Sequence, residues 1–291
     1  MNIENTKQSL PVRLVIVGAM VTIFSMVLAF PSHAAPPIKY CAGKNPKTSP
    51  NDVMVKVGTI CVDKYEASVW TEPRGKGVRP QNNPHFPATF PENGNWTVPV
   101  YATSKPGVVP STFITWFQAQ QACALSGKRL LTNAEWQMAA AGTPDPGAQG
   151  DGVATCNTNT TGPQEAGKAA SCVSNWGVSD MVGNVGEWVD DWIQGPGGVT
   201  QGSVVTGWNP NAKELASPEY GNDYIASIND AAHNNAPQTG APNAGLDINP
   251  FPAAIYRGGM WTSSDGGGVF MLVAQDSPSS MNNALGFRCA K

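Results

Sequence analysis

Residues 174–192 constrain this chain most, because they combine bulky apolar side chains with glycines. The stretch reads Ser-Asn-Trp-Gly-Val-Ser-Asp-Met-Val-Gly-Asn-Val-Gly-Glu-Trp-Val-Asp-Asp-Trp and holds three of the nine tryptophans. Its tryptophans, valines and methionine favour burial, whereas its glycines disfavour a regular helix or strand. The stretch therefore predicts an irregular buried turn, whose backbone carbonyls need partners.

Two kinds of partner are consistent with the carboxylates in this stretch. One is calcium, because Asp180, Glu187 and the carbonyls of Gly183 and Val185 would form the all-oxygen shell that this ion prefers. The other is a packed turn in which the carboxylates accept hydrogen bonds from backbone N–H groups. The spacing of the residues does not decide between them, and calcium is the cofactor that we expect at this turn.

Residues 1–34 have the pattern of a secretory signal peptide. Lys7 and Arg13 precede an uncharged apolar run at residues 14–30, and Ser-His-Ala at 32–34 offers a small-x-small cleavage site. The run is nearly long enough for a membrane anchor, so an uncleaved anchor is the alternative. With cleavage, we expect an exported protein, periplasmic, cell-surface or secreted, without stable membrane association.

Composition predicts that residues 35–291 form a single, loop-rich domain. The chain contains 31 glycines and 25 prolines, which favours short strands and loops over a helical bundle. No linker or internal repeat divides it. The formal net charge is −3 and basic residues do not cluster, so nucleic acid is not an expected partner.

Two capping boxes predict two helices. The first is Thr115-Trp-Phe-Gln and the second is Thr132-Asn-Ala-Glu. Glycines at 127 and 142 would end these helices. Upstream, residues 58–70 are rich in β-formers and are predicted as one strand. We interpret Asp63 and Glu66 on this strand as acids that tether the core.

Four motifs resemble the formylglycine-generating enzyme family, also called sulfatase-modifying factors. They are Gly-Lys-Arg-Leu-Leu-Thr-Asn-Ala-Glu-Trp at 127–136, Gly-Val-Ser-Asp-Met-Val-Gly-Asn-Val-Gly-Glu-Trp at 177–188, Arg-Gly-Gly at 257–259 and Gly-Phe-Arg-Cys at 286–289. In this order they cover nearly all of residues 35–291. The resemblance implies an α+β fold, a loop-rich variant of the C-type lectin fold with short mixed strands and two main helices.

Six cysteines, all beyond the signal segment, predict disulfides in an oxidising compartment. Many pairings are possible from the count alone. Spacing and the family resemblance together favour three pairs: Cys41–Cys61, Cys156–Cys172 and Cys123–Cys289. If all six are paired, no thiol remains for chemistry.

The resemblance also implies copper-dependent oxidation, but the required cysteines are missing. Members of the family oxidise a substrate cysteine with O₂ and a copper ion held by two cysteines shortly after Arg-Gly-Gly, since Cu(I) needs soft thiolates. Residues 260–285 contain no cysteine. Ser263 stands at the first cysteine position and Met260 where the family has an active-site serine. We therefore expect neither catalytic residues nor copper, and His85 and His233 are too few for a histidine-rich metal site.

Two functions remain open. The first is a non-catalytic ligand-binding or display protein that recognises an exported protein or a surface ligand. The second is an oxidoreductase that modifies an exported protein by a variant mechanism. Residues 261–283 also look like the C-terminal variable region of proteins diversified by retroelements, and they mix aromatic and small polar residues as paratopes do. The candidate ligand-binding residues are Trp261, Thr262, Ser263, Ser264, Asp265, Phe270, Gln275, Ser280 and Asn282.

Overall fold

The fold is known from a computed structural model, which places Ala35–Lys291 in one compact unit. None of the helices that it describes is long and apolar enough to cross a membrane. The predicted signal segment and both exported histidines lie outside the described residues. The described residues are 37–78, 99–144, 155–193, 225–227, 253–276, 278 and 280–291.

Both predicted helices are present and begin at their capping boxes. Helix α1 is Trp116–Leu125 and helix α2 is Asn133–Ala140. At the start of α1, the Thr115 hydroxyl accepts a hydrogen bond from the backbone N–H of Gln118, and the Gln118 side chain accepts one from the Thr115 N–H. Gly127 follows α1 with a φ of 67°, a conformation that glycine adopts without strain.

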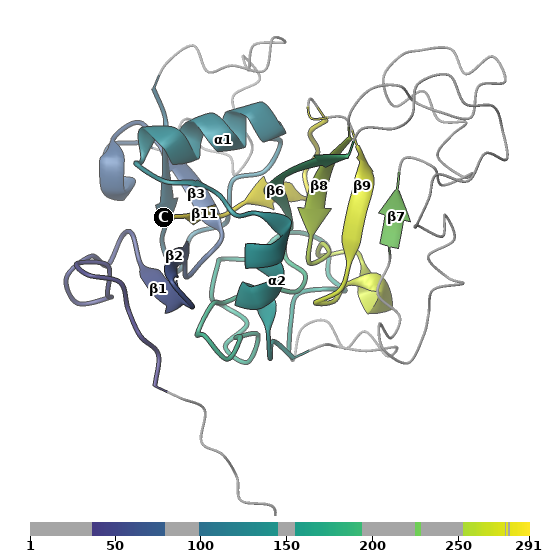
Figure 1. Ribbon diagram of the computed structural model, residues 1–291, viewed down its shortest axis with the longest axis horizontal. Helices are drawn as coiled ribbons and strands as arrows, with labels where there is room; N and C mark the ends of the chain where they lie inside the picture. Colours follow the sequence, from purple (N-terminus) through teal and green to yellow (C-terminus); the bar gives the residue numbers. More distant parts are fainter. Residues whose placement is uncertain are drawn as a thin grey trace, which may run out of the picture. The chain divides into compact units, whose positions relative to one another are not determined.

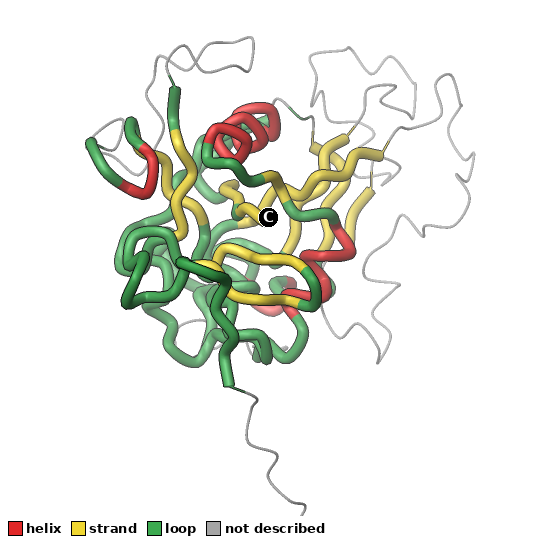
Figure 2. The backbone as a smooth tube through the Cα atoms, turned by 60° about the vertical axis from the view of Figure 1, so that its left-hand side comes forward, coloured by secondary structure: helices red, strands yellow, loops and turns green. Residues whose placement is uncertain are grey.

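The described strands form three sheets, and loops connect them over much of the trace (Figures 1 and 2). The four-stranded sheet has the order β1 (Met54–Val57), β2 (Ile60–Asp63), β11 (Cys289–Ala290), β5 (Arg129–Leu130). The five-stranded sheet has the order β10 (Leu285–Phe287), β6 (Gly186–Ile193), β8 (Ala253–Arg257), β9 (Leu272–Asp276), β7 (Ile225–Ser227). The third sheet pairs β3 (Ala67–Trp70) with β4 (Tyr101–Ser104), and short 3₁₀ helices lie at η1 (Pro73–Gly75) and η4 (Ser264–Gly266).

The five-stranded sheet is mixed, as expected for the predicted α+β class. Strand β10 runs parallel to β6, and β7 runs parallel to β9. In contrast, β6 pairs with β8 and β8 pairs with β9 in the antiparallel sense. Two helices beside short mixed strands confirm the fold class.

The predicted single strand at 58–70 is wrong, because it is broken into β2 and β3. At the break, the Lys64 side chain donates a hydrogen bond to the carbonyl of Gly177, and the Lys64 carbonyl accepts one from Ser179. These long-range bonds replace the strand ladder there. The break turns Glu66 toward the central motif, where its carboxylate is fully buried.

The central motif at 174–192 is irregular only in its first part, whereas its burial continues to Val189. Residues 174–185 form turns, as predicted, but from Gly186 onward the chain is the eight-residue strand β6, inside the five-stranded sheet. The prediction failed there because Gly186 pairs with Leu285 in β10 and lies against the Tyr256 ring, so it belongs to the sheet. Trp188 then points into the core.

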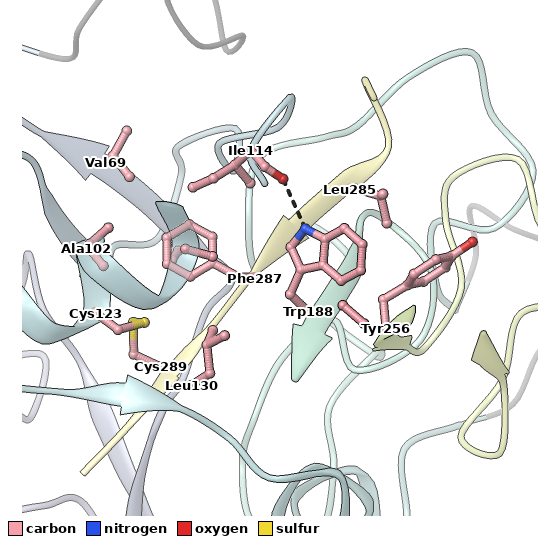
Figure 3. Close-up of a cluster of buried hydrophobic side chains, with 14 of the residues drawn as sticks. Val69, Ala102, Ile114, Cys123, Leu130, Trp188, Tyr256, Leu285, Phe287 and Cys289 are labelled. Atoms are coloured by element: carbon pink, nitrogen blue, oxygen red, sulfur yellow. Dashed lines mark hydrogen bonds between the residues drawn. A yellow bond between two sulfur atoms is a disulfide. The ribbon is translucent and has the colours of Figure 1, made fainter. Parts of the chain in front are cut away.

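The larger apolar core is built around Trp188 (Figure 3). Its ring is fully buried and meets the Tyr256 ring edge-on at a centroid distance of 5.5 Å. Its indole N–H donates to the carbonyl of Ile114 at 2.9 Å, so its one polar group is satisfied. Strand β6 is therefore held in the centre of the domain by packing and by a hydrogen bond.

Three disulfides join the pairs that spacing and the family resemblance predicted. They are Cys41–Cys61, Cys123–Cys289 and Cys156–Cys172. The second connects α1 to β11 across 166 residues, whereas the third closes a loop of 16 residues. No free cysteine remains.

We expect the Cys123–Cys289 bridge to stabilise the fold more than the Cys156–Cys172 bridge, because closing a longer loop restricts the unfolded chain more. Replacing Cys123 and Cys289 together by serine should cost about 5 kcal/mol, and replacing Cys156 and Cys172 together about 3 kcal/mol, in the chain-entropy model. Urea unfolding of the two double variants measures both costs. An equal or reversed order would contradict this explanation.

Candidate functional site

The guanidinium of Arg288, between β10 and β11, is completely buried. Its Nε donates to both carboxylate oxygens of Glu187, at 2.8 and 2.7 Å. Its two Nη atoms donate to the carbonyls of Ser179 at 2.9 Å and Asp63 at 3.1 Å. Arg288 therefore joins β2, the central turn and β6 at one point.

Glu187 is as deeply buried as its partner and has a second donor. The indole N–H of Trp136 in α2 donates to Glu187 Oε2 at 2.7 Å. Burial alone would lower the pKa of Arg288, but the carboxylates of Glu187, Glu66 and Asp180 raise it above its ordinary value. The arginine is thus held in its charged form by the acids around it.

The two carboxylates that were predicted to bind calcium, Asp180 and Glu187, already have hydrogen-bond partners within the protein. The carboxylate of Glu187 is already used by Arg288 and Trp136, and Asp180 Oδ2 accepts the backbone N–H of Gly167 at 2.5 Å. Among the described residues, no group of three or more His, Cys, Asp or Glu side chains could hold a metal. Arg288 therefore places a positive charge beside Glu187 without an ion.

A second buried ionic cluster holds the N-terminal hairpin. Lys128 Nζ lies 2.5 Å from Asp52 Oδ1 and 2.7 Å from Asp63 Oδ1, with its side chain only 1% exposed. The other oxygen of Asp63 accepts the backbone N–H of Cys289 at 3.1 Å. Asp63 thus tethers the core, as the sequence indicated.

Asn184 connects the core to the candidate ligand surface. Its side-chain N–H₂ donates to Glu66, and its side-chain oxygen accepts from Asn157 Nδ2 at 2.9 Å and from the backbone N–H of Gln164 at 2.7 Å. Its own carbonyl accepts the backbone N–H of Trp261 at 3.0 Å. Burial, followed by the nearby acids, raises the pKa of Glu66 well above its ordinary value. A single buried amide therefore fixes Glu66, the 157–164 loop and Trp261 together.

Arg257 fixes the start of the candidate surface. Its Nε donates to the carbonyl of Met271 at 2.7 Å, and its guanidinium lies over the Trp136 ring at 4.5 Å. It also contacts Asn133 and Gln137 of α2. The chain that follows β8 thus leaves the sheet from a fixed position.

Residues 260–267 form a tight turn where the family would hold copper. Ser263 Oγ accepts the backbone N–H of Met260 at 2.8 Å. A Cβ on Gly259, whose φ is 91°, would lie 2.7 Å from the Cα of Gly267, so the two backbone segments are packed directly together. No thiol is present, because all six cysteines are in disulfides. The turn is therefore held by its own backbone contacts.

The predicted ligand-binding residues lie in the turn, just after it, in β9 and in the segment before β10. Residues 261–265 lie in this turn, where Thr262 and Asp265 are exposed and the others are partly buried. Phe270, 37% exposed, follows it. Ser280 and Asn282 lie on the segment before β10, where the Asn282 carbonyl accepts the N–H of Phe113 at 2.8 Å. Gln275 is in β9, and its side chain is outside the described structure.

Sequence reasoning missed three parts of the site: Arg288, Asn184 and the 157–164 loop. Arg288 and Asn184 lie within recognised motifs, so a search of these motifs for partners of the buried acids could have found them. The loop is connected mainly through backbone groups, and no residue type in its sequence indicates that.

Removing Arg288 should leave Glu187 buried without a counter-charge. We expect Arg288→Met to destabilise the protein by about 3–5 kcal/mol, because breaking a buried ion pair strands the remaining charge. Lys56→Met, at an exposed lysine, is the control and should change stability by less than about 0.5 kcal/mol. Chemical denaturation measures both variants.

Thermal melting with and without calcium tests whether Arg288 or a calcium ion supplies the positive charge beside Glu187. Calcium should leave the melting temperature of the unmodified protein unchanged, because a ligand raises it only by binding the folded state. A rise with calcium that Glu187→Gln removes would contradict this interpretation.

Asp180 should make stability fall as the pH rises. Burial raises the pKa of Asp180 to about 6, and the Gly167 hydrogen bond and Arg288 offset this only in part. The folded state therefore favours the protonated acid, and its contribution is lost as the pH rises from about 4 through about 6. Relative to Asp180→Asn, the unmodified protein should lose on the order of 3 kcal/mol between about pH 4 and about pH 7. Denaturation at several pH values tests this, and a constant difference would contradict it.

Two known proteins are similar in sequence to part of this chain. A serine/threonine-protein kinase pkn1 of Chlamydia caviae is 27% identical over 184 residues, which cover 62% of this chain and 24% of the kinase. A hercynine oxygenase of Mycolicibacterium smegmatis is 28% identical over 134 residues, which cover 43% of this chain and 31% of the oxygenase. This chain thus spans a third or less of the length of these relatives.

Two solved structures are also similar to this chain over most of its length. The P3c variant of the Major Tropism Determinant is 17% identical with a TM-score of 0.43, covering 81% of this chain and 51% of that chain. Treponema denticola variable protein 1 is 17% identical with a TM-score of 0.41, covering 88% and 92%.

The match to a family covers most of the chain. The sulfatase-modifying factor enzyme 1-like domain matches residues 52–291, which include the four motifs. The two helices and short mixed strands agree with the C-type-lectin-like fold class that the resemblance implied. This chain therefore belongs to the sulfatase-modifying factor enzyme 1-like domain family.

Proposed function

We propose that this chain is an exported, non-catalytic member of its family that binds a partner through residues 261–282. The observation that carries the proposal is the turn at 260–267, where the family's copper cysteines are absent and Ser263 is bonded to Met260. The partner is an exported protein or a surface ligand.

The disulfides support export. All six cysteines are paired within this chain, and such bridges form and persist in oxidising compartments. A signal peptide at residues 1–34 would direct the chain there. The proposal therefore combines an N-terminal signal peptide with a domain whose disulfides suit an oxidising compartment.

The fixed backbone of the turn supports binding. Asn184 and Arg257 position its start, and Thr262, Asp265 and Phe270 remain exposed on it. A surface whose backbone is already ordered loses less conformational entropy when it binds a partner. The arrangement thus combines an ordered backbone with side chains that are exposed to solvent.

The loss of catalysis is tested directly with a sulfatase-type cysteine peptide. Purified protein incubated with Cu(I), O₂ and this peptide should form no formylglycine, because no thiolate pair is available to hold copper. A family member that retains both cysteines, assayed in parallel, is the positive control. Mass spectrometry of the peptide measures the product, and its formation by this protein would overturn the proposal.

A further inference from the structure

The loop at 157–164 lies directly against the candidate surface. The backbone N–H of Thr160 donates to the Trp261 carbonyl at 2.9 Å, and the backbone N–H of Ser264 donates to the Thr158 carbonyl at 2.7 Å. These two bonds join the loop to the turn in both directions. The loop and the turn therefore form one continuous structure.

A disulfide and hydrogen bonds to Asn184 also fix the position of the loop. The Cys156–Cys172 disulfide fixes its first end. The backbone N–H of Asn184 donates to the Asn157 carbonyl at 2.7 Å, and the Asn184 side chain accepts from Asn157 and Gln164. Asn184 also accepts the N–H of Trp261, so one residue sets the relative position of the loop and the turn.

The junction between loop and turn keeps unused hydrogen-bonding capacity. The Thr158 hydroxyl is fully buried, and neither it nor the indole N–H of Trp261 has a hydrogen-bond partner in the described structure. A buried polar group without a partner is destabilising, so both groups would gain from a partner that reached them. Beside this junction, Asn159 and Thr161 of the loop are exposed, as are Thr262 and Asp265 of the turn.

The charge of these segments indicates the chemistry of a partner. Between residues 157 and 165, and between 260 and 270, the ionisable side chains are Glu165 and Asp265, both acidic and exposed, and no lysine or arginine occurs. Electrostatic complementarity therefore favours a partner with positive charge. The exposed ring of Phe270 adds an apolar contact.

We propose that residues 157–164 form the second wall of the recognition surface, and that Asn159 and Thr161 contact the same partner as Trp261 and Asp265. The partner is a polypeptide segment that carries basic and apolar side chains. This inference rests on the proposed function, which it extends from residues 261–282 to a second segment of the chain.

The probe is a peptide selected from a displayed random library on the immobilised, unmodified protein. Thr161→Arg adds bulk and positive charge to the loop wall, and it should weaken binding of the selected peptide at least about tenfold. Trp261→Ala should weaken binding roughly thirtyfold, as loss of a buried aromatic contact does. Thr48→Arg is the matched control at another exposed threonine, and it should change affinity less than about twofold. Thermal melting of each variant checks folding.

The selected peptides should carry a net positive charge, and their affinity should fall as the ionic strength rises from about 0.05 to about 0.5 M. If Trp261→Ala abolishes binding and Thr161→Arg does not weaken it, the proposal that residues 157–164 contact the partner is wrong, while the proposed function stands. If neither variant weakens binding, both are wrong. Neutral or acidic peptides, or a glycan array that binds while no peptide is selected, would overturn the assignment of the partner.

Discussion

The buried contact between Arg288 and Glu187 is the interaction on which the rest of the structure depends. It brings together residues that are 101 positions apart in sequence, and it draws in Trp136 of α2 and carbonyls near β2. A buried ion pair repays its desolvation only when its remaining donors are satisfied. Here the other N–H groups of Arg288 meet carbonyls, so the pair specifies how four segments meet.

From this centre, buried polar groups extend toward the candidate surface. Glu66 lies near Arg288, accepts the backbone N–H of Val185, and holds the side chain of Asn184. Asn184 then positions both the 157–164 loop and Trp261. These bonds use backbone groups and buried side chains, whereas Thr161, Thr262 and Asp265 on the same two segments are exposed. This separation is what a binding surface on a rigid scaffold requires.

Local signals were predictable from the sequence, whereas long-range partners were predictable only for the cysteines, where the family resemblance indicated the pairs. The helices could be predicted because Thr115 and Thr132 form their caps with residues three positions away. The cysteine pairing followed from the family resemblance together with spacing. Glu187 was assigned to calcium because a carboxylate needs a positive partner, and its sequence neighbours do not show whether that partner is a metal ion or a distant arginine.

The same reason explains the other two differences. The strand at 58–70 is broken because Lys64 bonds to the turn at 177–179, which lies more than a hundred residues away in the sequence. The 157–164 loop joins the surface through backbone groups that every residue type carries. Residue identity therefore holds little information about either contact, and only the folded backbone reveals them.

Native-state hydrogen exchange tests most directly whether the surface belongs to the rigid scaffold. The amides of Asn184 and Trp261 donate to the carbonyls of Asn157 and Asn184, and the amide of Cys289 donates to Asp63 in the core. If the scaffold extends to the surface, all three should exchange only through global unfolding, with equal free energies of opening. Exchange of the Trp261 amide through a local opening of much lower free energy, with Cys289 still protected, would contradict this account.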